Sequence, residues 1–363
     1  MTTRNHSHTR ELIRSFNKTA TFLTAFPTKT QMDQLILVDD FTPTRTPVRN
    51  PRAGIAGREF TERGDDMTWT SGMSISENLT KSAAGTVLPF AMGGITTAGA
   101  GPYTHVLRAT AVGTIDMPTT SMLVRGTSTR GHDGSNVEYQ DLGCNEFTIS
   151  GSGSAGSPIK LNSTWIGSGK VTQDVTRADI TSVNKESLMR MGGLAFTLGN
   201  AGGAESSIVN KINSFSFGWN NGITEDRNRP AGSGMYAAYM LRGDMRACTF
   251  SFQIAHDGSD DFLDYLMPDA TPDGSADEQF RLACTLTMTD DSGNGNFVKI
   301  EIPEFYVVSL NPTMANDLIA YDVVCQPVWD VDGSGYDATD LGPAKITISN
   351  AAEYSTVPLT AAS

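Results

Sequence analysis

The sequence predicts a mainly β protein of the sandwich or barrel type with few short helices. After residue 57, short runs rich in Thr, Ser, Val, Ile and Phe alternate with clusters of Gly, Asn and Asp, which is the pattern of many strands joined by turns. Glycine is frequent, at 36 of 363 residues, and only 18% of the residues are charged. A chain of this length is expected to hold two domains or one large β domain.

Each candidate strand is a short run with β-branched or aromatic side chains, bounded by turn-forming residues. In several of these runs apolar and polar residues alternate, which is typical of a strand with one buried face. The segment 151–156 matches GxGxxG, but a strand follows it instead of a helix, so it predicts a hairpin and not a dinucleotide site. The candidate strands are 67–75, 103–112, 121–128, 137–139, 146–150, 159–166, 194–197, 211–219, 235–241, 247–255, 280–289, 297–302, 320–328 and 345–349.

One helix is predicted at 259–267, where Ser259 can cap the N-terminus, acidic residues follow, and a proline ends the segment. Two segments of the leader, 11–16 and 32–38, are predicted to form short helices or irregular packed structure. Residues 40–57 contain three prolines, which fix φ and remove backbone donors, so this segment is expected to be extended. An arm that reaches across a neighbour and a disordered leader both fit this composition.

The chain is divided into three parts on these grounds. An N-terminal arm covers 1–59, a first β unit covers 60–190, and a second β unit covers 191–363 with the predicted helix and an acidic C-terminal part. Two strands, 145–150 and 213–218, share the pattern Asn-x-Phe-(Thr/Ser)-apolar-small. This likeness indicates two related β units in tandem, although coincidence explains it equally well.

Charge is distributed unevenly along the chain, whose net charge is −13. Residues 1–60 carry nine basic and five acidic side chains, whereas the region from Phe250 onward carries three basic and 19 acidic ones. An overall basic nucleic-acid binder is therefore excluded, because such proteins cluster Lys and Arg against phosphate. The arm and the body are expected either to attract one another, between subunits, or to be solvated separately. The sequence has no run of 18 apolar residues, so no membrane span is expected. The N-terminal segment has no apolar stretch after its basic residues, so no secretory signal is expected.

No motif in the sequence indicates an enzyme, a cofactor or a metal centre. The four cysteines are far apart, so they form no CxxC motif and are expected to be buried, reduced thiols. Asp330–Asp340 begins like a calcium loop, but Leu341 stands where a bidentate carboxylate is needed, so an acidic turn or a weak cation site is expected. A hydrolase that uses the late acidic residues stays as the enzyme alternative, although nothing selects two of these carboxylates.

Three stretches carry a resemblance to a known family. The first is 68–76, TWTSGMSIS, and the second is 137–149, VEYQDLGCNEFTI, which precedes another candidate strand. The third comprises 299–307, KIEIPEFYV, then Asn311-Pro312, the segment 318–329, and the closing segment 344–350, AKITISN. In order and spacing these stretches resemble the tail tube proteins (major tail proteins) of long-tailed bacteriophages. The resemblance covers about residues 60–350, and the leader departs from the shorter family members.

The resemblance implies a tail-tube-type β-sandwich or barrel that forms closed rings, which stack into a hollow tail tube. It implies that DNA crosses the lumen without specific binding, and that the partners are the tape-measure, tail terminator and distal tail proteins. It also implies a virion protein that is made in the bacterial cytoplasm. Family members form hexameric rings, or trimeric rings with pseudo-sixfold symmetry when one chain holds two tube-type units, and the length and repeated strand favour the trimer. A decoration or baseplate protein and a carbohydrate-binding adhesin module are the alternatives.

Strand alternation, taken with this resemblance, gives the candidate site residues. The side chains predicted to fill the core are Phe147, Ile149, Phe215 and Phe217. Their polar neighbours are predicted to face outward or into the lumen, and these are Glu146, Thr148, Ser150, Ser214 and Ser216. The arginines of the arm are predicted to contact an adjacent subunit, and these are Arg45, Arg49, Arg52 and Arg58.

Overall fold

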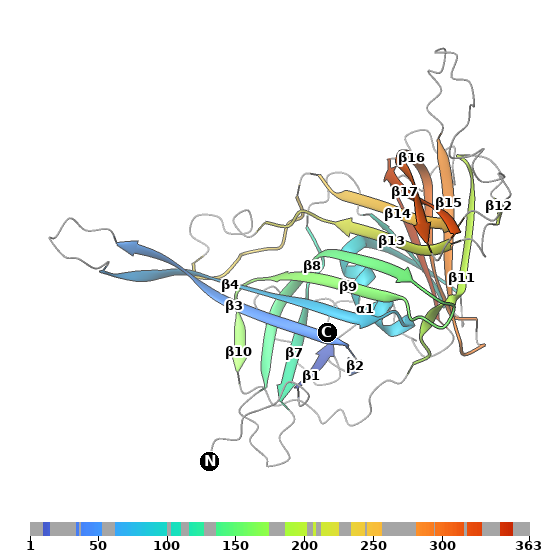
Figure 1. The fold of residues 1–363 in the computed structure, drawn as a ribbon. Helices are drawn as coiled ribbons and strands as arrows, with labels where there is room; N and C mark the ends of the chain where they lie inside the picture. The colour runs from blue at the N-terminus through green and yellow to red at the C-terminus, as the bar shows by residue number, and fades with distance from the viewer. Residues whose placement is uncertain are drawn as a thin grey trace.

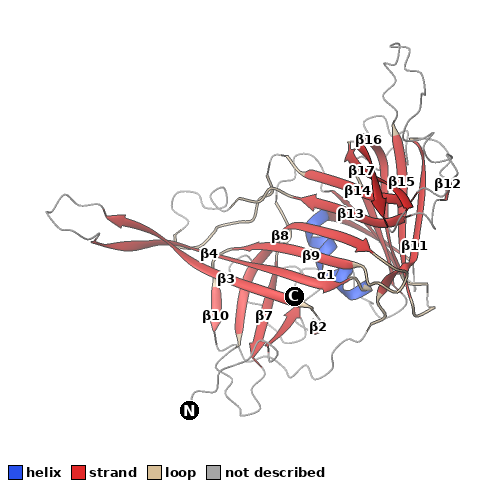
Figure 2. Ribbon diagram, in the orientation of Figure 1, coloured by secondary structure: helices blue, strands red, loops and turns tan. Residues whose placement is uncertain are grey.

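The computed structural model confirms a mainly β fold, with 18 strands and one helix in the part of the chain that it describes (Figure 1, Figure 2). The described residues are 10–14, 34–35, 38–52, 62–99, 103–109, 116–126, 136–173, 186–201, 206–207, 212–224, 234–243, 245–255, 281–293, 295–315, 318–328 and 342–350. The elements are β1 (Arg10–Arg14), β2 (Gln34–Leu35), β3 (Asp40–Arg52), β4 (Glu62–Asn78), α1 (Lys81–Met92), β5 (Gly93–Ala98), β6 (Tyr103–Ala109), β7 (Thr120–Gly126), β8 (Val137–Ser152), β9 (Lys160–Gly167), β10 (Val171–Gln173), β11 (Met189–Asn200), β12 (Ser206–Ser207), β13 (Ile212–Asn220), β14 (Ala247–Ala255), β15 (Leu282–Asp290), β16 (Phe297–Ala315), β17 (Leu318–Pro327) and β18 (Lys345–Asn350).

Eight strands form what we call the large sheet, in the order β3-β4-β9-β8-β13-β14-β17-β16, and every neighbouring pair is antiparallel. A second sheet has the order β12-β11-β15-β16-β18-β6-β5. A small sheet has the order β2-β1-β7-β8-β10. Because β16 pairs in the first two sheets and β8 pairs in the large and small sheets, these two long strands hold the layers together.

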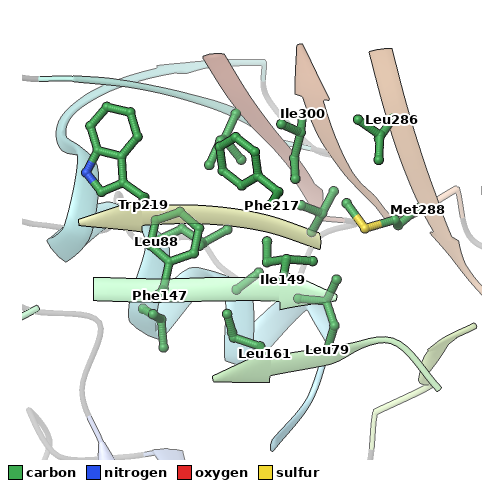
Figure 3. Packing of buried hydrophobic residues seen from close by; sticks show 14 of the residues in the cluster. Leu79, Leu88, Phe147, Ile149, Leu161, Phe217, Trp219, Leu286, Met288 and Ile300 are labelled. Atoms are coloured by element: carbon green, nitrogen blue, oxygen red, sulfur yellow. The ribbon is translucent and has the colours of Figure 1, made fainter. Parts of the chain in front are cut away.

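The large and second sheets share one hydrophobic core. The ring of Phe196 in β11 lies 5.2 Å from that of Phe252 and 6.3 Å from that of Phe250, both in β14, so side chains of the two sheets meet. Burying a large apolar side chain contributes about 1.5–3 kcal/mol, and this core contains dozens of them. Figure 3 shows part of it, with labelled side chains from the large sheet, the second sheet and α1 that include Phe147, Phe217, Leu88, Leu286 and Ile300.

Helix α1 packs against β8, β18, β5 and β6 and is buried in every residue after Lys81. At its start, the Thr80 hydroxyl accepts a hydrogen bond from the Ala83 amide at 3.1 Å, and Gly93 ends it at a φ of 84°. Apolar residues surround this helix, so its sequence has no 3.6-residue periodicity, and it contains a glycine and a proline. For these two reasons sequence analysis does not predict it.

The side-chain amide of Asn221 connects three parts of the core. Its Nδ2 donates to the carbonyl oxygens of Ala91 in α1, at 2.8 Å, and of Cys144 in β8, at 3.0 Å. Its Oδ1 accepts a hydrogen bond from the indole N–H of Trp219 at 3.0 Å. The side chain is fully buried, so these partners replace the water that it loses on folding.

A buried ion pair joins the small sheet to the large sheet. The guanidinium group of Arg14 in β1 donates to both carboxylate oxygens of Glu77 in β4, at 2.8 and 2.5 Å. Both side chains are almost completely buried. Burial raises the pKa of the Glu77 carboxyl above its ordinary value, and the Arg14 charge offsets part of that shift.

Most of the candidate strands are confirmed. The segment 247–255 coincides with β14, and 345–349 lies within β18. The segments 137–139 and 146–150 are two parts of the single long strand β8. The glycine-rich segment 151–156 ends β8 and forms the turn into β9, as expected for a hairpin.

Three predictions about local structure need correction. The segments 11–16 and 32–38 are not helical where they are described, because their residues pair as strands β1 and β2. The segment 235–241 is not a strand, because its backbone bonds to Trp69, Met117 and Ser168 in three different places and not to one ladder. Residues 40–52 are extended as expected, but they pair with β4 over their whole length. The predicted helix 259–267 lies outside the described residues.

All four cysteines are free and buried, as the sequence predicts. Burial raises the pKa values of the thiols of Cys144, Cys248 and Cys325, because a thiolate would lose its hydration. No helix among the described residues is long and apolar enough to cross a bilayer.

Replacing Asn221 with Leu is expected to lower the free energy of unfolding by roughly 3 kcal/mol or more, because three buried groups lose their hydrogen-bond partner. Urea unfolding followed by tryptophan fluorescence measures this change. The matched control is Asn162→Ala at an exposed position, which is expected to change stability by no more than about 0.5 kcal/mol. Equal effects of the two substitutions would show that the Asn221 bonds do not stabilise the fold.

The folded protein is expected to resist alkylation by iodoacetamide from pH 7 to pH 9. A raised thiol pKa keeps the thiolate fraction of Cys144, Cys248 and Cys325 negligible across this range, and burial excludes the reagent from all four thiols. Mass spectrometry should count no modified cysteine in the native protein and four after unfolding in urea. Labelling of the native protein that rises tenfold per pH unit would contradict the assigned burial.

Candidate functional site

The outward side of the large sheet presents almost only uncharged polar and small side chains, and we call it the polar face. The strand register places these side chains in four rows that run across the sheet. The rows are Asp40, Ser76, Asn162, Thr148, Gly218, Thr249; then Thr42, Ser74, Thr164, Glu146, Asn220, Ala247; then Asn78, Lys160, Ser150, Ser216, Ser251, Val324, Ser309; and last Ser152, Ser214, Gln253, Asp322, Asn311.

Two shallow grooves follow this face. The larger one, of about 540 Å³, crosses β8, β13, β14 and β17, and its lining includes Ser150, Ser216, Ser251 and Gln253. The smaller one, of about 220 Å³, crosses β3, β4, β9 and β8. Both are open depressions in which hydroxyl and amide side chains lie among apolar ones and a few charged ones, so they offer scattered weak hydrogen bonds.

Charge is sparse on the polar face, and its sign is negative. The four rows contain three carboxylates and one ammonium group, those of Asp40, Glu146, Asp322 and Lys160. Lys160 forms an ion pair with Asp39, just before β3, which neutralises the single cation. The Asp322 carboxylate accepts a hydrogen bond from Gln253 at 2.7 Å. The remaining carboxylates leave the face with a small net negative charge.

The structure places the predicted site residues as follows. The four predicted core residues Phe147, Ile149, Phe215 and Phe217 are at most 3% exposed. The five polar candidates all lie on the polar face, and β8 and β13 bring them together because the two strands are neighbours. The register sets Ser150 opposite Ser216 and Glu146 opposite Asn220.

The predicted arm residues lie partly on β3. The Arg45 guanidinium stacks over the ring of Trp69 in β4, at 4.2 Å from its centroid. Arg49 and Arg52 belong to the same strand, and Arg58 lies outside the described residues. The β3–β4 hairpin extends far from the body of the molecule (Figure 1).

Sequence reasoning missed the part of the polar face that β14 and β17 supply, namely Ser251, Gln253 and Asp322. The alternation of Cys248, Phe250, Phe252 and Ile254 with small polar residues in β14 carries the same signal as β8 and β13. It also missed that the two similar segments, 145–150 and 213–218, lie on neighbouring strands of one sheet.

Within the described residues, no group of three or more His, Cys, Asp or Glu side chains is placed to hold a metal ion. The candidate cation loop Asp330–Asp340 lies outside the described residues. His105 in β6 is 2% exposed, and a hydrogen bond of 2.8 Å joins its Nδ1 to the Thr97 hydroxyl.

The large sheet consists of two groups of four strands with the same internal order. In chain order, the first group begins with the hairpin β3–β4 and is completed by β8 and β9, giving β3-β4-β9-β8. The second begins with the hairpin β13–β14 and is completed by β16 and β17, giving β13-β14-β17-β16. The ladder between β8 and β13 joins the groups.

Comparison with known proteins agrees with a structural role for such a sheet. The family model described as "Phage tail tube protein" matches residues 16–361, which is nearly the whole chain. A search of curated proteins finds no match. The protein therefore belongs to the phage tail tube protein family and is a structural protein of the virion tail.

Proposed function

We propose that copies of this protein close into rings, that the rings stack into the tail tube, and that the polar face lines the lumen through which DNA passes. The observation that carries this proposal is a single wide sheet with one buried face, one polar face and, among the described strands, an outer edge without a partner strand at each end. The tape-measure, tail terminator and distal tail proteins are the partners that such a tube requires. Synthesis in the bacterial cytoplasm belongs to the same proposal.

The chemistry of the polar face suits a conduit for DNA. Hydroxyl and amide groups stay hydrated and bind a passing polyanion weakly. The few carboxylates, such as Glu146 and Asp322, repel phosphate, and the Asp39 carboxylate neutralises Lys160. A basic lining would retain DNA, because each phosphate contact adds affinity through counterion release.

Two four-stranded groups in one chain support a trimeric ring with pseudo-sixfold symmetry over a hexamer. Three copies would supply six groups in the same order around the ring. The division of the chain into an arm of 1–59 and units of 60–190 and 191–363 is part of this proposal, with β3 of the arm as the first strand of the first four-stranded group. The arm is proposed to contact an adjacent copy through the β3–β4 hairpin, whose strand β3 includes Arg45.

Electron microscopy of the purified protein tests the proposal. The expected result is hollow tubes or closed rings whose averaged end views show three copies. Isolated compact particles at every concentration would contradict tube formation and favour a decoration or baseplate protein.

Two arginines on the polar face are expected to make the tubes bind DNA. The variant Thr148→Arg/Ser216→Arg places two cations there, while the unmodified tubes should not retain DNA. Co-sedimentation of tubes with short linear DNA, measured across a salt series, reports the binding, which should weaken as salt rises.

The matched control is Thr285→Arg/Thr287→Arg on the outward side of the second sheet, where the same charge would lie outside the lumen. DNA should then enter the tube only in the first variant, so nuclease should spare bound DNA in that variant and digest it in the control. Equal protection in both variants would contradict the assignment of the lumen.

A further inference from the structure

The large sheet ends in an unpaired strand edge on both sides. β3 pairs only with β4, and residues 306–315 of β16 pair only with β17, among the strands that the structure describes. Figure 1 shows β3 and β16 on opposite sides of the molecule. An unpaired edge can pair with another chain, and two different edges on one chain allow head-to-tail contacts that close a ring.

The two four-stranded groups can be aligned residue by residue because they share an irregularity. The pairing of β8 with β9 shifts register between Cys144 and Glu146. The pairing of β16 with β17 shifts register between Val307 and Ser309, at the same place in its group. Superposing the two shifts makes Glu146 equivalent to Ser309.

This equivalence extends across both groups without a break. From Glu146 the register passes through Thr164 and Ser74 to Thr42 in β3. From Ser309 it passes through three residues to β13, namely Val324, Ser251 and Ser216. Thr42 of β3 is therefore equivalent to Ser216 of β13.

The ladder inside the chain then serves as a template for a ladder between copies. Ser150 of β8 lies opposite Ser216 of β13. Ser150 follows Glu146 by four residues, so its equivalent on β16 is Thr313. The equivalent contact therefore sets Thr313 of one copy opposite Thr42 of the next.

We propose that β16 of one copy pairs antiparallel with β3 of the next copy in this register. The contacts are Ser309 opposite Thr46, Asn311 opposite Thr44, and Thr313 opposite Thr42. The inference rests on the proposed ring assembly and names the strands and residues that form it. The polar face then continues from one copy to the next, as it does across β8 and β13.

The side chains at the β16 edge support this contact independently. Val308 is 64% exposed, Met314 is 73% exposed, and Ile319 of β17 is 46% exposed. Exposed apolar side chains gathered on one hairpin mark an interaction surface. The proposed register places Met314 opposite Phe41 of the next copy, which already packs on the core.

The prolines of the two edges fall at matching positions. Trp69 in β4 donates its amide to a loop carbonyl at 2.9 Å and not to β3, so the opposite residue, Pro47, turns its nitrogen to the free edge. Pro43, four residues earlier, does the same. In the proposed register Pro43 lies opposite Pro312 of the neighbouring copy. Pro47 lies opposite Val308, which is the extra residue at the register shift of β16, where regular pairing is already interrupted. Each edge alone is thus a poor template for an unrelated strand.

Engineered disulfides test the register. The pair Thr44→Cys and Asn311→Cys occupies a rung without backbone hydrogen bonds, where Cα atoms lie about 4.5 Å apart and suit a disulfide. Oxidised tubes of the double variant should give covalent oligomers on non-reducing gels, ending at the number of copies in a ring. A mixture of the two single variants should give only dimers. The native cysteines are buried and should not compete.

The controls separate this inference from the function on which it rests. Thr44→Cys with Thr313→Cys is shifted by two residues and should not cross-link, whereas Ser150→Cys with Ser216→Cys should close a disulfide within one chain. Should the first pair disturb assembly, Thr46→Cys with Ser309→Cys probes the same register. Tubes that form but cross-link only in the shifted pair, or in none, would overturn the proposed contact and leave the tube intact. Failure of the unmodified protein to form tubes or rings would instead overturn the proposed function.

Discussion

The ladder between β8 and β13 is the interaction on which the rest of the structure depends. Seven residue pairs along it convert two four-stranded groups into one sheet with a continuous register. Because a shift of one residue would move every side chain to the opposite face, this ladder fixes both the shared core and the shared polar face. The buried amide of Asn221, just after β13, anchors the end of the ladder to α1 and β8.

Alternate residues of each strand in the large sheet have different roles. Those on one face form the core, and those on the other face form the polar surface. Inward residues such as Phe217 and Phe250 bury apolar area against the second sheet and α1, which stabilises the fold. Outward residues such as Ser216 and Ser251 lie on the polar face and set its surface chemistry. The chemistry of the polar face can therefore change by substitution while the core residues stay the same.

The sequence predicts many of the strands and their buried faces. The other elements could not be predicted, because they depend on contacts between residues that are far apart in the chain. The alternation around Phe147 and Ile149 predicts β8 because a half-buried strand has a period of two. The sequence does not predict strand β1, because its partner β7 lies more than a hundred residues away in the chain. The buried helix α1 has no polar side to reveal it. The polar candidates were found on two strands, but the sequence holds no signal that those strands are neighbours.

The burial of all four thiols affects how the protein responds to reducing and oxidising surroundings. In the proposed function the subunit is made inside a bacterial cell, where thiols are kept reduced, and the tail then persists in oxidising surroundings. A fold held by disulfides would be incomplete in the first setting, and one with accessible thiols would be cross-linked or oxidised in the second. With its thiols enclosed, this protein would keep one covalent structure through both, so the proposed release from the cell would require no chemical maturation of the subunit.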